Sequence, residues 1–125
     1  MGPVERAVRK HIHPPEQLYT PGQEKPFTVE RFDPQGIDLL FGKGEARTPM
    51  PWEALEGLPD LLRGRGWVRT TGSFSVGGDV STVSGFLKQF VNRESANWVM
   101  VLLERAGVVE LDRSRPVTAR LSPKW

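Results

Sequence analysis

Apolar and polar residues alternate in the first half of the chain in a way that predicts short antiparallel strands. Residues 27–32 begin with the alternation Phe-Thr-Val-Glu, and residues 37–41 form a second apolar segment. Between them, residues 33–36 carry proline and glycine at positions that a type I turn favours. A Gly-Lys-Gly sequence then leads into a third short segment, 45–48. The pattern therefore predicts a three-stranded antiparallel meander.

Helical signals flank this meander. Residues 3–11 have a proline near the first helical position and apolar residues on one side, which predicts a short helix. Residues 14–26 contain four prolines and predict an extended strap, with Tyr19 as its expected anchor. Residues 51–56 predict a helix that begins with proline, and residues 60–63 predict one further turn.

The second half of the chain predicts a strand, a glycine-rich loop, two helices and a hairpin. The strand is expected at residues 66–71 and the loop at 72–78. The first helix is expected to be capped by Asp79 or Ser81 and to end near Val91, and the second to cover residues 95–105, with Ser95 as its cap and Gly107 as its stop. The hairpin is expected to pair residues 108–111 with 117–121. Helix, turn, helix, glycine, strand, basic loop, strand is the order of a winged helix-turn-helix. The expected fold class is therefore α+β: a small antiparallel sheet packed with a C-terminal helical, winged-helix-like unit.

Length and composition narrow the class of protein. With 125 residues, the chain is expected to form one domain over residues 1–125. It has no long apolar run and no apolar leader, so we expect no membrane span, no secretion signal and a cytoplasmic location. Cysteine is absent, which excludes disulfides and thiolate metal sites. His11 and His13 have no further histidine to join them, so we expect no metal and no cofactor.

Positive charge is concentrated in residues 61–93. This segment holds five basic residues and one acidic residue, a net charge of +4, whereas the whole chain carries +2. Aromatic, hydroxyl and glycine residues are interspersed among the basic ones. Guanidinium and hydroxyl groups bind phosphates, an aromatic face stacks on a base, and glycines allow close backbone approach. The segment therefore favours a polyanionic partner, and double-stranded DNA is the partner that we expect.

The candidate residues fall into two groups by their chemistry. The expected DNA-backbone contacts are Lys43, Arg47, Arg63, Arg65, Arg69, Thr71, Ser73, Ser75, Arg113 and Arg115. The expected contacts to a base are Trp67, Phe74 and Trp98. Each has a structural alternative: the arginines can solvate a surface, and Trp67 or Trp98 can pack in the core. Phe74 lies between serines in a glycine-rich loop, where burial is harder to arrange.

Five segments resemble the N-terminal domains of actinobacterial McrA-like HNH endonucleases and their stand-alone relatives. They are residues 26–31, 44–48, 52–57, 62–69 and 108–113. The resemblance covers most of the chain and implies a domain that reads 5-methylcytosine in DNA, for which Trp67, Phe74 and Trp98 are the candidate contacts to the methyl group. The chain departs from the endonucleases because it has no HNH motif. The resemblance thus implies an isolated reader domain or a stand-alone homologue, and it transfers no individual base contact.

Catalytic motifs are absent from the sequence. It contains no Asp…Glu-x-Lys nuclease pattern, no nucleophile elbow and no Gly-Lys-Ser/Thr phosphate loop. The sequence therefore predicts a non-catalytic reader of modified DNA. Two alternatives stay open: a winged-helix binder of unmodified DNA, and a protein-docking module anchored by aromatic residues. The helix at 95–105 is poorly basic on its polar face, which argues against its insertion into a DNA groove.

Overall fold

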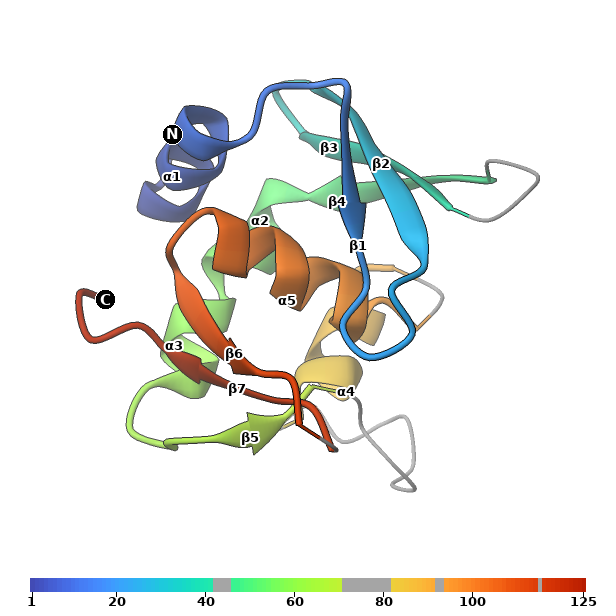
Figure 1. Ribbon diagram of the computed structural model, residues 1–125. Helices are drawn as coiled ribbons and strands as arrows, with labels where there is room; N and C mark the ends of the chain where they lie inside the picture. Colours follow the sequence, from blue (N-terminus) through green and yellow to red (C-terminus); the bar gives the residue numbers. More distant parts are fainter. Residues whose placement is uncertain (42–45, 71–81, 92–93, 115) are drawn as a thin grey trace.

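The protein contains two antiparallel sheets with a helix between them. The computed structural model describes residues 1–41, 46–70, 82–91, 94–114 and 116–125. The helices are α1 (Pro3–His11), α2 (Trp52–Glu56), α3 (Leu58–Leu62), α4 (Val83–Lys88) and α5 (Ala96–Arg105), and the strands are β1 (Glu16–Tyr19), β2 (Pro26–Phe32), β3 (Gly36–Phe41), β4 (Ala46–Pro51), β5 (Val68–Arg69), β6 (Val109–Asp112) and β7 (Thr118–Leu121). Figure 1 shows α5 near the centre, with the larger sheet on one side and the smaller sheet on the other. The expected α+β class is confirmed.

The larger sheet is a meander in the order β1-β2-β3-β4. Its β2–β3 connection is the predicted turn: the Asp33 carboxylate accepts hydrogen bonds from the main-chain N–H groups of Gln35 and Gly36, at 2.7 and 2.8 Å. The three predicted strands are confirmed, but the sheet has a fourth strand. Residues predicted as a strap pair with β2 as strand β1, in which Leu18 lies opposite Phe27. Tyr19 is not an anchor: it is 53% exposed, because the alternation of the strand turns Leu18 inward instead.

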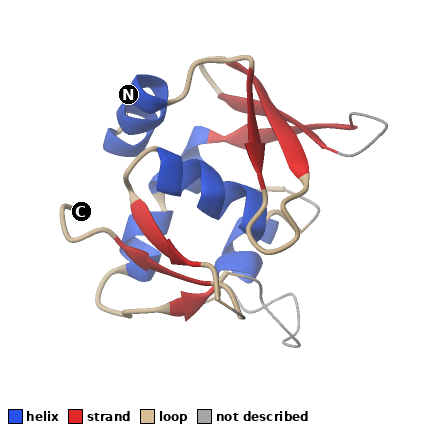
Figure 2. Ribbon diagram, in the orientation of Figure 1, coloured by secondary structure: helices blue, strands red, loops and turns tan. Residues whose placement is uncertain are grey.

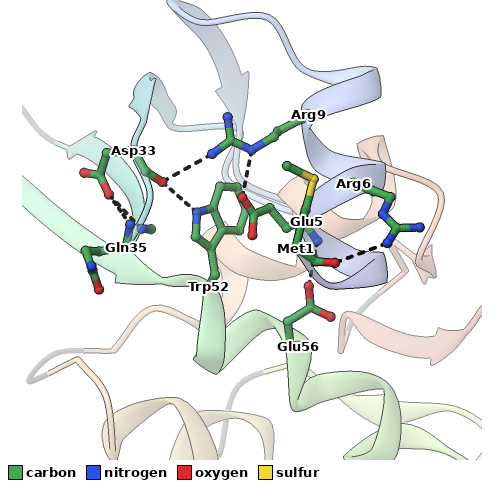
Figure 3. A network of polar contacts seen from close by, with 9 residues as sticks. Met1, Glu5, Arg6, Arg9, Asp33, Gln35, Trp52 and Glu56 are labelled. Atoms are coloured by element: carbon green, nitrogen blue, oxygen red, sulfur yellow. Dashed lines mark hydrogen bonds and ion pairs between the residues drawn. The ribbon is translucent and has the colours of Figure 1, made fainter.

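Helix α1 is fixed to the rest of the protein by a polar network that Figure 3 shows. The Glu56 carboxylate, from α2, accepts hydrogen bonds from the first N–H groups of α1, those of Val4 and Glu5, at 3.1 and 2.9 Å. A carboxylate at a helix N-terminus satisfies unpaired N–H groups and complements the helix dipole. Arg9 lies over the rings of Phe32 and Trp52, 5.2 Å from each centroid. This network therefore has a structural role.

The smaller sheet has the order β5-β7-β6 and contains the predicted hairpin. The chain reverses after α5 at Gly107, where φ is +82°. The N–H of Val108 donates to the carbonyl of Leu103, and that of Gly107 donates to Glu104, which is a Schellman arrangement. The predicted end of the helix is therefore confirmed. Figure 2 shows the central helix, α5, lying between the strands of the two sheets, and the N-terminal helix, α1, at the edge of the molecule.

Helix capping differs from the sequence prediction at both helices of the C-terminal half. The N-cap of α4 is Thr82, whose hydroxyl accepts from Gly85 N–H at 3.0 Å, while Asp79 and Ser81 lie outside the described residues. Ser95 occupies the N-cap position of α5, but its side chain makes no capping bond. Its backbone lies at φ −134° and ψ 3°, outside the extended conformation that a capping serine uses. The preceding residue, Glu94, supplies the acceptor instead, to the N–H of Ala96.

Helix α5 is largely enclosed by the surrounding elements. It contacts α1, α4, β1 and β6. Six of its ten residues are buried, and one hydrophobic cluster includes side chains of α5 and of both sheets. The exposed Arg105 is held by Glu16 of β1 at 2.8 Å. The helix is therefore a core element, and β1 would have to separate from it before it could enter a DNA groove.

Candidate nucleic-acid interface

Strand β5 and the residues before it present a basic and aromatic surface. Trp67 is 46% exposed, so the structure decides against a core position for this residue. The guanidinium carbon of Arg120, on β7, lies 4.6 Å from the centroid of the Trp67 ring. Arg120 also forms an ion pair with Glu110 of β6 at 2.6 Å. Sequence reasoning missed Arg120, because only the pairing of β7 with β5 brings this residue to Trp67.

The three arginines predicted to contact phosphate differ in their surroundings. Arg63 donates to the main-chain oxygen of Trp125 at 2.5 Å and lies 3.6 Å from the Asp60 carboxylate. Arg63 therefore has an acidic neighbour that lies just outside the basic segment 61–93. Arg65 and Arg69 are exposed. Within the described part of the chain, Arg69 makes no ion pair and no side-chain hydrogen bond.

Two further predicted contacts are already engaged within the protein. Arg47 of β4 forms an ion pair with Glu30 of β2 at 2.8 Å. Arg113 donates twice to the Glu104 carboxylate, at 2.6 Å each, and this hydrogen bonding raises its pKa above the ordinary arginine value. A forked pair of this kind occupies the donors that a phosphate would need. These two arginines are therefore weaker candidates than Arg69.

Several candidates have no described position. Lys43, Thr71, Ser73, Phe74, Ser75 and Arg115 lie outside the described residues. Their predicted contacts to DNA stay predictions.

Trp98 lies at the start of α5 and is half-buried. Its ring stacks on Phe41 of β3, with ring centroids 3.5 Å apart and an interplanar angle of 15°. It also lines a pocket of about 390 Å³. The remaining lining comes from the β1–β2 connection, the residues at the start of α5 and the residue before β7: Thr20, Pro21, Gly22, Gln23, Lys25, Glu94, Asn97 and Val117. Trp98 therefore combines a structural contact with a position in a pocket wall.

A buried hydrogen bond connects this pocket to β5. Thr70, which directly follows β5 and is 1% exposed, donates its hydroxyl to the Asn97 side-chain oxygen at 2.8 Å. Its main-chain N–H donates to the carbonyl of Val117 at 3.2 Å. Arg69 is the preceding residue in the chain, and its side chain is exposed whereas that of Thr70 is buried. The structure thus joins the end of β5 to the start of α5, segments that lie far apart in the sequence.

No metal centre or membrane span is found among the described residues. No group of three or more histidine, aspartate or glutamate side chains in that part of the chain is arranged to hold a metal ion. None of the described helices is long and apolar enough to cross a membrane. Comparisons with protein-family models, with curated proteins and with solved structures found no match to this chain.

Proposed function

We propose that this protein is a non-catalytic DNA-binding domain that recognises 5-methylcytosine. The observation that carries the proposal is the exposed Arg69, which is unpaired among the described residues and lies next to Thr70, the residue bonded to a pocket wall that includes Trp98. An arginine of this kind can contact a phosphate without first giving up an internal partner. Trp67 and Arg120 add an aromatic and a second cation to the same small sheet.

The methyl specificity has a separate basis. It rests on the resemblance to the N-terminal domains of McrA-like endonucleases and on the aromatic residues near the basic strand. A methyl group adds a small apolar surface to a polar base edge, and a fitted apolar or aromatic contact discriminates such a difference by about 1–3 kcal/mol. Trp98, Phe74 and Trp67 are the residues that we propose for this contact.

We also propose that the C-terminal half is winged-helix-like. Helices α4 and α5 and the hairpin β6–β7 follow in the predicted order, and β5 completes a three-stranded sheet. DNA contact would then come from β5 and the hairpin, because α5 is enclosed. This arrangement disfavours the alternative of a winged-helix protein that reads unmodified DNA through its second helix.

The proposal is tested by fluorescence anisotropy with short labelled duplexes over a range of salt concentrations. We expect Arg69→Ala to weaken binding to every duplex and to reduce the slope of log K against log salt by about 1. Lys10→Ala is the matched control: it removes the same charge from an exposed position on α1, which lies on the opposite side of the molecule from β5 (Figure 1). If Arg69→Ala and Lys10→Ala bind DNA with equal affinity, β5 is not part of the DNA interface.

The same titration separates the DNA reader from the protein-docking alternative. A phosphate-driven complex weakens steeply as salt rises, whereas an interface anchored by aromatic residues need not. Tighter binding to the methylated duplex than to the unmodified duplex at one salt concentration is the expected result. Equal affinities would refute the methyl specificity and leave general DNA binding.

A further inference from the structure

The pocket beside Trp98 has the size and composition of a small-molecule site. Its volume of about 390 Å³ lies within the range of about 300–1,000 Å³ that such sites occupy. It contains an aromatic wall, apolar surface from Pro21 and Val117, and several polar side chains. No role for its polar side chains follows from DNA-backbone binding alone.

Two of these polar side chains are held in fixed orientations by neighbours outside the pocket. One oxygen of Glu94, Oε1, accepts hydrogen bonds from the Ser84 hydroxyl at 2.9 Å and from the main-chain N–H of Ala96 at 3.1 Å. Asn97 accepts the Thr70 hydroxyl through Oδ1, which assigns its other terminal atom, Nδ2, as the free donor. Among the described residues, neither Glu94 Oε2 nor Asn97 Nδ2 has a hydrogen-bond partner. The pocket therefore has one fixed acceptor and one fixed donor available.

This pair of groups matches the edge of a cytosine. Glu94 directly precedes the N-cap of α5, Asn97 lies in the first turn of the helix, and both residues line the pocket. Cytosine carries an N4 amino donor beside its N3 and O2 acceptors, and a glutamate is a suitable acceptor for N4. Glu94 Oε2 would accept from N4, while Asn97 Nδ2 would donate to N3 or O2. Pro21 and Val117 add apolar surface to that of Trp98 for a methyl group, and Lys25 also lines the pocket.

We infer that this pocket receives one cytosine base extruded from the bound duplex, an inference that rests on the proposed DNA-binding function. Extrusion costs a few kcal/mol, which hydrogen bonds to the base edge and aromatic contact offset. Thr70 ties the end of β5 to the pocket, and we assign the phosphate contact to Arg69, the exposed residue that precedes Thr70 in the chain.

The test exchanges the donor and the acceptor. Thymine shares the 5-methyl group of 5-methylcytosine but has an acceptor at position 4 and a donor at N3. The double variant Glu94→Gln/Asn97→Asp offers the complementary pattern and leaves the net charge unchanged. The introduced amide and carboxylate side chains still provide the oxygen atoms that accept from Ser84, Ala96 and Thr70.

Binding is measured with two matched duplexes, one with a central 5-methylcytosine·guanine pair and one with a thymine·guanine pair. In each, 2-aminopurine replaces the base next to the target, so that its fluorescence rises when the target base leaves the stack. For the wild type, we expect this rise with the methylcytosine duplex. For the double variant, we expect the ratio of the two affinities to shift at least about tenfold toward thymine.

The single variant Glu94→Gln isolates the acceptor. It should lose about tenfold of the affinity for the methylcytosine duplex, because an amide donor would face the N4 amino group. Glu53→Gln, at an exposed position on α2, is the control with the same change of charge. Two results would overturn the pocket assignment and leave the DNA-binding proposal intact. One is normal DNA binding by the wild type without a fluorescence rise. The other is equal affinity of Glu94→Gln and Glu53→Gln for the methylcytosine duplex. If no duplex binds even at low salt, both proposals fail.

Discussion

Replacing Thr70 with valine is expected to destabilise the protein by about 1 kcal/mol. Valine keeps the branched shape and the main-chain N–H of Thr70, so the substitution removes only the hydroxyl that donates to Asn97 at 2.8 Å. A net hydrogen bond contributes about 0.5–1.5 kcal/mol, and a fully buried acceptor left without a partner costs about 1–3 kcal/mol. Thr70 is 1% exposed, but Asn97 is only half-buried, so water can reach part of the released amide. The lower part of the range therefore applies.

Urea denaturation provides the assay. The midpoint should fall while the slope m stays unchanged, because the surface exposed on unfolding is the same. Thr28→Val is the matched control, since Thr28 is a half-buried strand residue for which no side-chain hydrogen bond is found in the described part of the chain. A double-mutant cycle with Asn97→Ala should give a coupling energy of about 1 kcal/mol. If Thr70→Val is as stable as Thr28→Val and the coupling is near zero, the hydrogen bond does not fix β5 to α5, and the reasoning is refuted.

Three further substitutions test the fold. Glu56→Ala should cost about 1–2 kcal/mol, measured by urea denaturation, because two N–H groups at the start of α1 lose their carboxylate acceptor; an unchanged midpoint would contradict this. Gly36→Ala should cost about 1–3 kcal/mol, since the added Cβ would overlap the main-chain carbonyl of Met50, and wild-type thermal stability would show that the strand adjusts freely. Ser114→Ala should raise the pKa of Asp112 toward its ordinary value in an NMR titration, because hydrogen bonds from the Ser114 hydroxyl and N–H lower it. The stabilisation linked to that lowered pKa is present above the unfolded-state pKa and is lost as pH falls through the folded-state pKa. If the pKa of Asp112 is the same in Ser114→Ala as in the wild type, the Ser114 hydroxyl is not the cause of the lowered pKa.

Local sequence signals determined most of the secondary structure. The turn at residues 33–36, the stop at Gly107 and the helix over residues 96–105 follow from interactions within a few residues, which a sequence pattern records directly. Strand β1 was not predicted, because the prolines that flank it favour an extended strap and only pairing with β2 makes it a strand. The enclosure of α5 had a signal in the run Val-Met-Val-Leu-Leu, which is apolar on more than one side of a helix.

The candidate site depended on tertiary structure to a much greater degree. The sequence identified Arg69 and Trp98 by residue type, but the tertiary structure decides which other side chains contact them. Arg47 and Arg113 have the same chemistry as Arg69 in the sequence, and only strand pairing and the packing of α5 place a carboxylate against each of them.

The pocket was decided by the tertiary structure alone. Its walls come from the β1–β2 connection, the start of α5 and the residue before β7, segments that have no local pattern in common. Glu94 and Asn97 are ordinary polar residues at a helix start until Ser84 and Thr70 fix one end of each side chain. Sequence periodicity reports which residues face the core, because burial repeats along a helix or strand. It does not report which distant segments meet, because those contacts arise only when the whole core packs.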